Sequence, residues 1–379
     1  MTTLSDEGVI PRYFGGSLAD VIPSAVAALG IPGWSNLLGL PASSSYVVFL
    51  VDGLGWNLLR SRAELAPYLT SLAAAEGSEP LTCGVPSTTV TSLTSLGTGL
   101  PPGAHGVVGF TSRIPGTNDL LDALRWDRDI DPRQWQPHDT AFARAAAAGV
   151  STTSVSKRRF EGSGLSVASQ RGADFHGADT IGERISATVR AAAQPTSLTY
   201  VYEGELDSTG HHKGTKSWAW EHQLSAADSF AAQLREALPR HTTLVVVADH
   251  GMVDVAPELK LDVDEHPQLM QGVSLFGGEA RFRHLYCDAG AVDEVAFTWR
   301  EQLGVHAWVV TRDQGIDEGW FGSVDSEVRP RLGDVMVASR GNAVVVSTKR
   351  RPEEAALIGF HGSLTADEML VPLLVDTAG

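Results

Sequence analysis

Three short apolar runs most constrain the architecture that this chain can adopt. They cover residues 46–51, 198–202 and 242–248, and each is rich in β-branched or aromatic side chains. Continuous apolar runs of this length are typical of strands buried on both faces of a parallel sheet. Helical patterns separate the runs, and a further strand is expected at 149–155. The alternation predicts an α/β fold built on a doubly wound, mostly parallel sheet.

The alternation changes near residue 257, where a compact β-α-β pattern begins. We expect residues 257–326 to form a small inserted α+β cap. Strands near 334–338 and 343–347 are expected to return to the core. Residues 1–256 and 327–379 are then the first and final parts of the core domain. A chain of 379 residues is long enough for one large domain with such an insertion.

Composition excludes several classes of partner. The formal net charge of −16 argues against a nucleic-acid polymer, because phosphate backbones bind basic surfaces. The two cysteines, Cys83 and Cys287, are too few for a disulfide framework, and we expect both to be small buried apolar residues. The first residues lack the pattern of a secretory signal, and the longest apolar runs are far shorter than a membrane span. We expect a cytoplasmic protein without a membrane partner, and its oligomeric state stays open.

Acidic residues follow each of the three predicted strands, and histidines lie beside them or near the end of the chain. These residues are Asp52, Asp207, His211, Asp249, His250 and His361. Because the carboxyl ends of parallel strands meet at one edge of a sheet, the side chains can converge there. Gathering them without a cation would be costly, and such oxygen and nitrogen ligands suit zinc, with manganese or iron as alternatives. The adjacency of Asp249 and His250 is easier to understand if two metal ions lie side by side.

A cluster of hydroxyl residues opens the helical segment that begins near residue 89. Five of the six residues from 87 to 92 are Ser or Thr, and the run at 81–85 before them is expected to be a short strand. The start of a helix presents unpaired N–H groups and a positive dipole end, which suit an anionic phosphate and a nucleophilic hydroxyl. An N-cap on a Ser/Thr-rich surface helix is the alternative interpretation.

Several motifs occur in order along the chain: LVDGLG, PSTT, TGLPPGAHG, DSTGH, ADHGM and a late HG followed by Glu368 and Val-Pro. This ordered set resembles the alkaline-phosphatase superfamily and is most similar to its nucleotide pyrophosphatase/phosphodiesterase branch. The resemblance extends from residue 46 to residue 372 and covers nearly the whole expected core. It implies an alkaline-phosphatase-like core fold.

The resemblance also implies a role for each matching residue. Thr89 matches the family's nucleophile, because it stands in register with the TGL and HG motifs downstream. The implied ligands of one metal ion are Asp52, Thr89, Asp249 and His250, and those of the other are Asp207, His211 and His361. The implied cofactors are therefore two divalent metal ions, either zinc or manganese or iron. The implied reaction is in-line attack by Thr89 on phosphorus, giving a phospho-threonine ester that water then hydrolyses.

The implied activity is cleavage of phosphodiester or pyrophosphate bonds in a small phosphorylated substrate of the nucleotide type. The first alternative is a phosphomonoesterase or phosphonate hydrolase on the same core, and a phosphomutase would usually require a larger insertion. A non-catalytic metal-binding protein is the remaining alternative. Sulfatases of the superfamily use C-x-P-x-R, whereas the segment from Cys83 to Pro86 has another spacing and lacks the arginine.

One position departs from the family pattern. The phosphodiesterase branch commonly has an asparagine three residues after the nucleophile, where it donates to a phosphate oxygen, but this chain has Ser92. We expect either that the Ser92 hydroxyl contacts the substrate instead or that the donor comes from elsewhere. Phe110 and Trp126 are candidates to line the substrate pocket, although aromatic residues more often belong to the core. Glu368 is expected to support the loop of His361.

Overall fold

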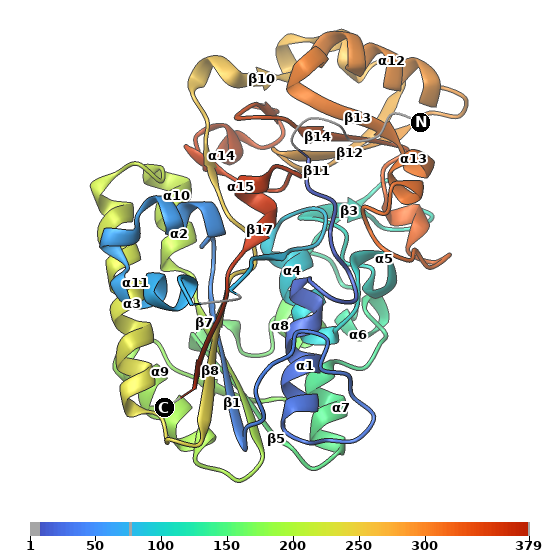
Figure 1. Cartoon of the computed structure of the whole chain (residues 1–379). Helices are drawn as coiled ribbons and strands as arrows, with labels where there is room; N and C mark the ends of the chain where they lie inside the picture. The colour runs from blue at the N-terminus through green and yellow to red at the C-terminus, as the bar shows by residue number, and fades with distance from the viewer. Residues whose placement is uncertain (1–7, 76–77, 378–379) are drawn as a thin grey trace.

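The computed structural model describes residues 8–75 and 78–377 (Figure 1). A six-stranded sheet forms the centre of the core, in the order β18-β8-β1-β7-β5-β6. Its pairs are parallel except for β18, which runs antiparallel to β8. The bounds are Ser45–Val51 (β1), Ser151–Ser156 (β5), Asp174–Gly177 (β6), Ser197–Glu203 (β7), Thr242–Val247 (β8) and Leu373–Thr377 (β18). The predicted α/β fold with a mostly parallel sheet is therefore confirmed.

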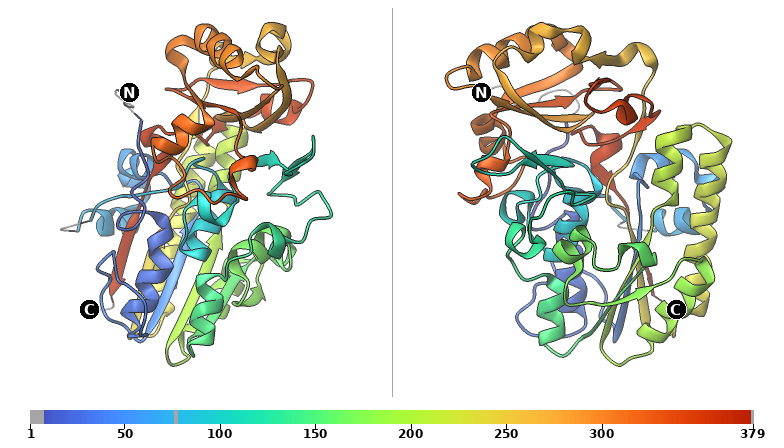
Figure 2. Two further views of the ribbon diagram at one scale, coloured as in Figure 1. Left: turned by 90° about the vertical axis from the view of Figure 1, so that its right-hand side faces the viewer. Right: turned by 180° about the vertical axis from the view of Figure 1, so that it is seen from behind.

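Helices cover both faces of this sheet, which makes the sheet doubly wound (Figures 1 and 2). Helices α1, α4, α7 and α8 pack together on one face, and α3, α9 and α11 pack together on the other. Their bounds are Val21–Ala28 (α1), Pro67–Ala73 (α3), Thr89–Thr98 (α4), Ala141–Ala147 (α7), Gly164–Gln170 (α8), Ile181–Ala192 (α9) and Trp218–Ala237 (α11). All of β1 and β8 is buried as a result, which explains their continuous apolar sequences. Among the described helices, none has the length and apolar character needed to cross a membrane.

Shorter elements connect the core. They are α2 (Trp56–Ser61), α5 (Pro102–His105), α6 (Pro132–Trp135), α10 (Glu205–Lys213), α14 (Pro352–Ala355), α15 (Ala366–Met369), β3 (Thr111–Arg113), β4 (Leu120–Asp122), β9 (Val253–Asp254) and β16 (Gly359–Phe360). The strand expected at 81–85 is reduced to β2 (Leu81–Thr82), which pairs with β17 (Leu370–Val371) outside the central sheet. Gly84 and Pro86 explain the early end, because glycine weakens a strand and proline cannot donate to its ladder. Helix α4 therefore follows a loop rather than a central strand.

A second sheet lies at one end of the core, in the upper part of Figures 1 and 2. It is antiparallel, has the order β11-β12-β14-β13, and packs against α12. The bounds are Val273–Glu279 (β11), Phe282–Cys287 (β12), Val292–Leu303 (α12), Ala307–Thr311 (β13), Arg312–Asp317 (α13) and Val335–Ser339 (β14). We call this α+β unit the cap.

The expectation that the strands after residue 326 return to the core is wrong. Strand β14 lies between β12 and β13 in the cap sheet, and β15 (Val344–Val346) pairs with β10 (Lys260–Asp262). All five residues of β14 are buried, and burial alone does not distinguish one sheet from another. A division of the chain at residue 326 therefore cuts through the cap sheet.

A buried ion pair joins the cap to the core. Arg281, in the turn between β11 and β12, donates from Nε to Glu368 Oε1 at 2.9 Å, and both side chains are 0% exposed. Glu368 Oε1 also accepts from the backbone N–H of Ser363 at 3.0 Å. These bonds fix the loop that follows His361, as expected for Glu368.

Gly97 determines how closely α4 packs against α8. A Cβ atom at Gly97 would lie 1.7 Å from the carbonyl oxygen of Ser169, so Gly97→Ala forces the two helices apart. We expect the substitution to lower the free energy of unfolding by about 2–3 kcal/mol, because overpacking displaces backbone. Urea denaturation followed by circular dichroism measures this loss.

Gly182→Ala in α9 is the matched control. No described heavy atom lies within 4 Å of the added Cβ, so the change carries no steric cost. We expect it to raise the free energy of unfolding by about 0.5–1 kcal/mol, because alanine restricts the unfolded chain. Equal losses in the two variants would show that α4 does not depend on this close approach.

Candidate active site

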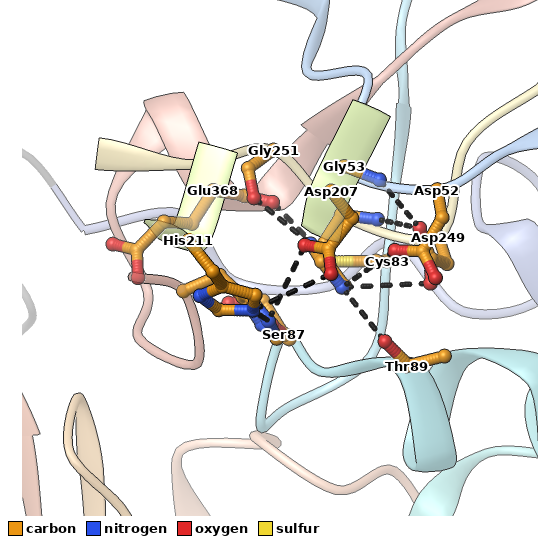
Figure 3. Close-up of polar contacts among 12 residues, drawn as sticks. Asp52, Gly53, Cys83, Ser87, Thr89, Asp207, His211, Asp249, Gly251 and Glu368 are labelled. Carbon is orange, nitrogen blue, oxygen red and sulfur yellow. Dashed lines mark hydrogen bonds and ion pairs between the residues drawn. The ribbon is translucent and has the colours of Figure 1, made fainter. Parts of the chain in front are cut away.

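Asp52, Asp207, His211 and Asp249 lie close together (Figure 3), and each follows one of the strands β1, β7 and β8 along the chain. Asp52 follows β1 directly, and Asp249 with His250 follows β8. Asp207 and His211 come from α10, one helical turn apart. His361 follows β16 on a distant segment of the chain. The structure thus brings all six residues together.

The six residues form two adjoining groups. In the first, His250 Nε2 lies 3.4 Å from Asp52 Oδ1 and 3.4 Å from Asp249 Oδ2. In the second, His211 Nε2 lies 3.4 Å from an Asp207 oxygen and 3.2 Å from His361 Nε2. The rings of His250 and His361 stack with centroids 3.5 Å apart, which links the groups. Within each group the potential ligand atoms lie within 4.8 Å of one another, so each could hold a metal ion.

Backbone carbonyls orient the three imidazole rings. Nδ1 of His211 lies 2.8 Å from the Gly359 carbonyl oxygen, that of His361 lies 2.9 Å from the Ser87 carbonyl, and that of His250 lies 2.9 Å from the Gly251 carbonyl. An Nδ1–H that donates to a carbonyl leaves Nε2 as the basic nitrogen. All three Nε2 atoms therefore face into the groups, which is the arrangement that histidine ligands commonly have.

Each of the three site carboxylates has one buried oxygen that no described hydrogen-bond donor contacts. Asp52 Oδ1, Asp207 Oδ1 and Asp249 Oδ2 are buried without a hydrogen-bond partner among the described residues. Burial raises the pKa of Asp52 well above its ordinary value, and the charges of Asp249 and Asp207 raise it further. Burial also raises the pKa of Asp249, and it lowers that of His361 well below its ordinary value. Orphaned carboxylate oxygens that face basic nitrogens are a donor set that fits divalent cations.

Thr89 is the first residue of α4, and its Oγ1 lies 3.1 Å from His250 Nε2. The neighbouring hydroxyls are engaged elsewhere: Ser87 donates to the Ser363 carbonyl, and Thr91 donates to the Val107 carbonyl. Thr88 occupies the N-cap, yet its side chain makes no capping hydrogen bond to the described backbone. The structure therefore separates Thr89 from the rest of the hydroxyl cluster and leaves the start of α4 open to an anion.

A cleft of about 370 Å³ opens beside the two groups, and Thr89, Asp207, His211 and His361 line it. Its wall is partly apolar and partly charged, with Phe110, Leu124, Leu357 and Phe360 beside Arg125, Arg351 and Glu279. A larger hollow of about 450 Å³, near Arg12 and β18, shares no lining residue with either group. We assign the chemistry to the smaller cleft, because Thr89 and the group of Asp207, His211 and His361 line it.

Of the three predicted substrate contacts, only Phe110 is among the residues that line the cleft. Phe110 lines the cleft, with the Arg351 guanidinium 5.2 Å from its ring centroid. Trp126 is outside the described lining: its Nε1 donates to the Ile130 carbonyl at 2.7 Å, and its ring packs against Gly164. The chain turns at Trp126 with a φ of 53°, and the partly buried indole packs against the core. A contact between Trp126 and the substrate stays a prediction.

Ser92 is also outside the described lining of the cleft. It is 0% exposed, one turn further along α4, and its hydroxyl lies against the thiol of Cys83. The contact between Ser92 and the substrate therefore stays a prediction, and the described residues give its hydroxyl oxygen no hydrogen-bond partner. Cys83 is buried, as expected, and Cys287 is partly buried.

Sequence reasoning missed Tyr202 and Glu279. The Tyr202 hydroxyl donates to Asp52 Oδ2, which leaves only Oδ1 of that carboxylate free. Tyr202 lies near the end of a predicted strand, so its place beside Asp52 could have been found from strand pairing. No sequence pattern marks Glu279, which reaches the cleft from the cap.

The doubly wound core, the paired acid–histidine groups and the threonine at a helix start define a phosphoester hydrolase of the alkaline-phosphatase superfamily. Residues 46–364 match the model of the type I phosphodiesterase/nucleotide pyrophosphatase family, and the chain belongs to that family. It is therefore a hydrolase that acts on phosphodiester or pyrophosphate bonds. No curated protein sequence matches the chain.

Solved structures with the same fold include murine and human ectonucleotide pyrophosphatase/phosphodiesterase 5. An inactive threonine-to-alanine variant of the murine protein, in complex with AMP, has a TM-score of 0.70 at 17% identity, covering 88% of each chain. Two further structures, of the murine and the human protein, each have a TM-score of 0.69 at 17% identity, covering 87% of each chain. At 17% identity, this similarity shows that the chains share a fold.

Proposed function

We propose that this protein hydrolyses a phosphodiester or pyrophosphate bond of a small nucleotide-type substrate through a phospho-threonine at Thr89, with two divalent metal ions. The observation that carries the proposal is the Thr89 hydroxyl 3.1 Å from His250 Nε2, beside carboxylate oxygens that lack partners among the described residues. One ion would be held by Asp52, Thr89, Asp249 and His250, and the other by Asp207, His211 and His361. We favour zinc, with manganese or iron as alternatives, because the donors are imidazole nitrogens and carboxylate oxygens.

In the first step, the Thr89 oxygen forms a bond to phosphorus while the bond from phosphorus to the leaving oxygen breaks. The Thr89 oxygen loses its proton, and the leaving oxygen gains one. In the second step, water attacks the threonine ester and restores the hydroxyl group. The open N–H groups at the start of α4 face the anionic phosphate. When bound, divalent cations supply charge that stabilises the attacking and leaving oxygens.

The cleft wall supports a nucleotide-type substrate. Phe110, Leu124 and Leu357 provide an apolar surface that suits a base, and Arg125 and Arg351 provide positive charge that suits phosphate. The AMP bound to the inactive murine relative supports the same class.

Two chromogenic substrates test the proposal. We expect protein loaded with zinc or manganese to hydrolyse bis-p-nitrophenyl phosphate faster than p-nitrophenyl phosphate. Faster cleavage of the monoester would favour the phosphomonoesterase alternative. Cleavage of neither substrate with either metal would favour a metal-binding protein without this activity.

A further inference from the structure

Three charged residues form a chain beside the cleft, where the cap meets α14. Arg283 lies in β12, and its Nη2 donates to Glu354 Oε2 at 2.6 Å. The other oxygen of Glu354 lies 3.6 Å from Nε of Arg351, the N-cap residue of α14. Neither arginine has a further ion pair among the described residues. Two guanidinium groups therefore share one carboxylate, and one positive charge is left without a counterion.

The nearby carboxyl groups do not neutralise this charge. Glu279 also lines the cleft, but burial raises its pKa to about 8, so it is largely uncharged at neutral pH. Glu353 is exposed, and solvent screens its charge. Asp122 lies near Arg351, but its carboxylate pairs with the Arg125 guanidinium at 3.9 Å. The Arg351 guanidinium is therefore available to an anionic ligand.

Arg351 is held in place before a substrate arrives. Its side chain is only 19% exposed, and its guanidinium lies 5.2 Å from the Phe110 ring centroid, on the wall of the cleft. Arg125, the second arginine of this wall, has a side chain that is 63% exposed. Binding an anion costs less conformational entropy at a side chain that is already ordered. Arg351 is therefore the better placed of the two arginines to select a substrate.

The described contacts of Arg351 do not include the residues that would hold the reacting phosphate. Arg351 contacts Phe110 and Glu354, whereas the reacting phosphate belongs beside Thr89, at the start of α4. A simple diester has one negative charge, which lies on that phosphate. A pyrophosphate has a second phosphoryl group with a charge of its own, and this group matches a fixed cation elsewhere on the cleft wall.

On the basis of the proposed function, we propose that this cleft selects pyrophosphate bonds over simple diesters, because Arg351 binds the second phosphoryl group of the substrate. The guanidinium N–H groups donate charge-assisted hydrogen bonds to the oxygens of that group. The Phe110 ring and the Glu354 carboxylate hold the guanidinium in position. Arg351 is thereby a specificity-determining residue, and it takes no part in bond formation at phosphorus.

Two substrates that share an AMP group test this inference. One is the p-nitrophenyl ester of AMP, a simple diester, and the other is diadenosine diphosphate, in which a pyrophosphate links two nucleosides. Release of AMP by the metal-loaded protein, measured by chromatography, gives kcat/KM for each. Arg351→Gln is expected to lower the ratio of kcat/KM for the pyrophosphate to that for the diester about 10- to 100-fold, because charge-assisted hydrogen bonds are lost. Arg351→Lys retains the charge and is expected to keep more of this preference.

Arg350→Gln is the matched control. Arg350 adjoins Arg351 and loses the same charge in this variant, but it pairs with Asp264 at 3.0 Å and is not among the described residues that line the cleft. The ratio is expected to equal that of wild type. Thermal melting and metal content are expected to be similar in all three variants, which separates a lost substrate contact from a displaced α14.

An unchanged ratio in Arg351→Gln would overturn this inference and leave the proposed function intact. A preference lost equally in Arg351→Gln and Arg351→Lys would also overturn it, since packing alone would then explain the effect. A wild type that cleaves the diester but not the pyrophosphate would contradict it as well. A wild type that cleaves neither substrate would overturn the proposed function itself.

Discussion

Thr89→Ala is expected to lower the rate of diester hydrolysis about 10⁴-fold or more, because the variant loses the hydroxyl group that forms the covalent intermediate. Thr89 Oγ1 is the hydroxyl that lies 3.1 Å from His250 Nε2, whereas the hydroxyls of Ser87 and Thr91 donate to backbone carbonyls. Those neighbours therefore cannot replace it without losing their own bonds. Initial rates on bis-p-nitrophenyl phosphate, measured at saturating metal, give the comparison.

Thr89→Ser and Thr94→Ala are the controls for this prediction. Serine retains the hydroxyl, so Thr89→Ser is expected to keep a large part of the activity. Thr94 lies in the same helix, but its hydroxyl donates to the Val90 carbonyl at 2.7 Å. Its replacement is expected to cost about 1 kcal/mol of stability and to leave the rate near that of wild type. Activity in Thr89→Ala equal to that of wild type would remove Thr89 from the mechanism.

Asp249→Asn is expected to abolish most of the stabilisation that metal gives the protein. A metal present at about a thousand times its dissociation constant raises the free energy of unfolding by about 4 kcal/mol. Asp249 is 0% exposed, and its Oδ2 faces His250 Nε2 at 3.4 Å without a hydrogen-bond partner among the described residues. An amide has no charge to offer a cation, so we expect a much smaller rise in Tm when zinc or manganese is added.

The same variant is expected to be more stable than wild type when metal has been removed by a chelator. In the wild type, Asp249 Oδ1 accepts hydrogen bonds from the N–H groups of Gly53 and His250, both at 3.1 Å. The amide oxygen in Asp249→Asn would still accept both. The substitution would also remove one of several crowded negative charges, a gain of about 1 kcal/mol. Melting curves with and without metal, together with the metal content per chain, measure both effects.

Asp228→Asn is the matched control, because Asp228 is also buried and accepts from backbone N–H groups at Tyr68 and Leu69. Its replacement is expected to leave the metal-induced rise in Tm intact. A rise in Asp249→Asn as large as that in wild type would contradict the assigned ligand set.

The central sheet could be predicted from the sequence because its strands are buried on both faces. An apolar run that ends in Asp52 or Asp249 identifies both a strand and its carboxyl end, and parallel strands bring such ends together. Asp52, Asp249 and His250 therefore converge as the topology requires, with Asp207 and His211 joining them from α10. His361 reaches the same place from β16, outside the central sheet.

The cap could not be placed in the same way. The buried pattern of β14 fits any sheet, and its pairing with β12 and β13 depends on contacts between segments far apart in the sequence. The same limit applies to Glu279, which lines the cleft only because of where the cap rests against the core.

Side-chain direction was the second limit. Ser92 and Trp126 stand at suitable positions along the chain, but Ser92 turns towards Cys83 and Trp126 turns towards Gly164. The phase of a helix and the φ angle at a turn decide these directions, and neither can be read from residue types alone.

The stereochemical course at phosphorus is the most direct test of a reaction through phospho-threonine. A phosphorothioate diester of known configuration would be hydrolysed in ¹⁸O-labelled water, and the configuration of the thiophosphate product would be determined. Each in-line displacement inverts phosphorus, so attack by Thr89 followed by attack by water is expected to give net retention. Net inversion would show a single direct attack by water and would contradict Thr89 as the nucleophile.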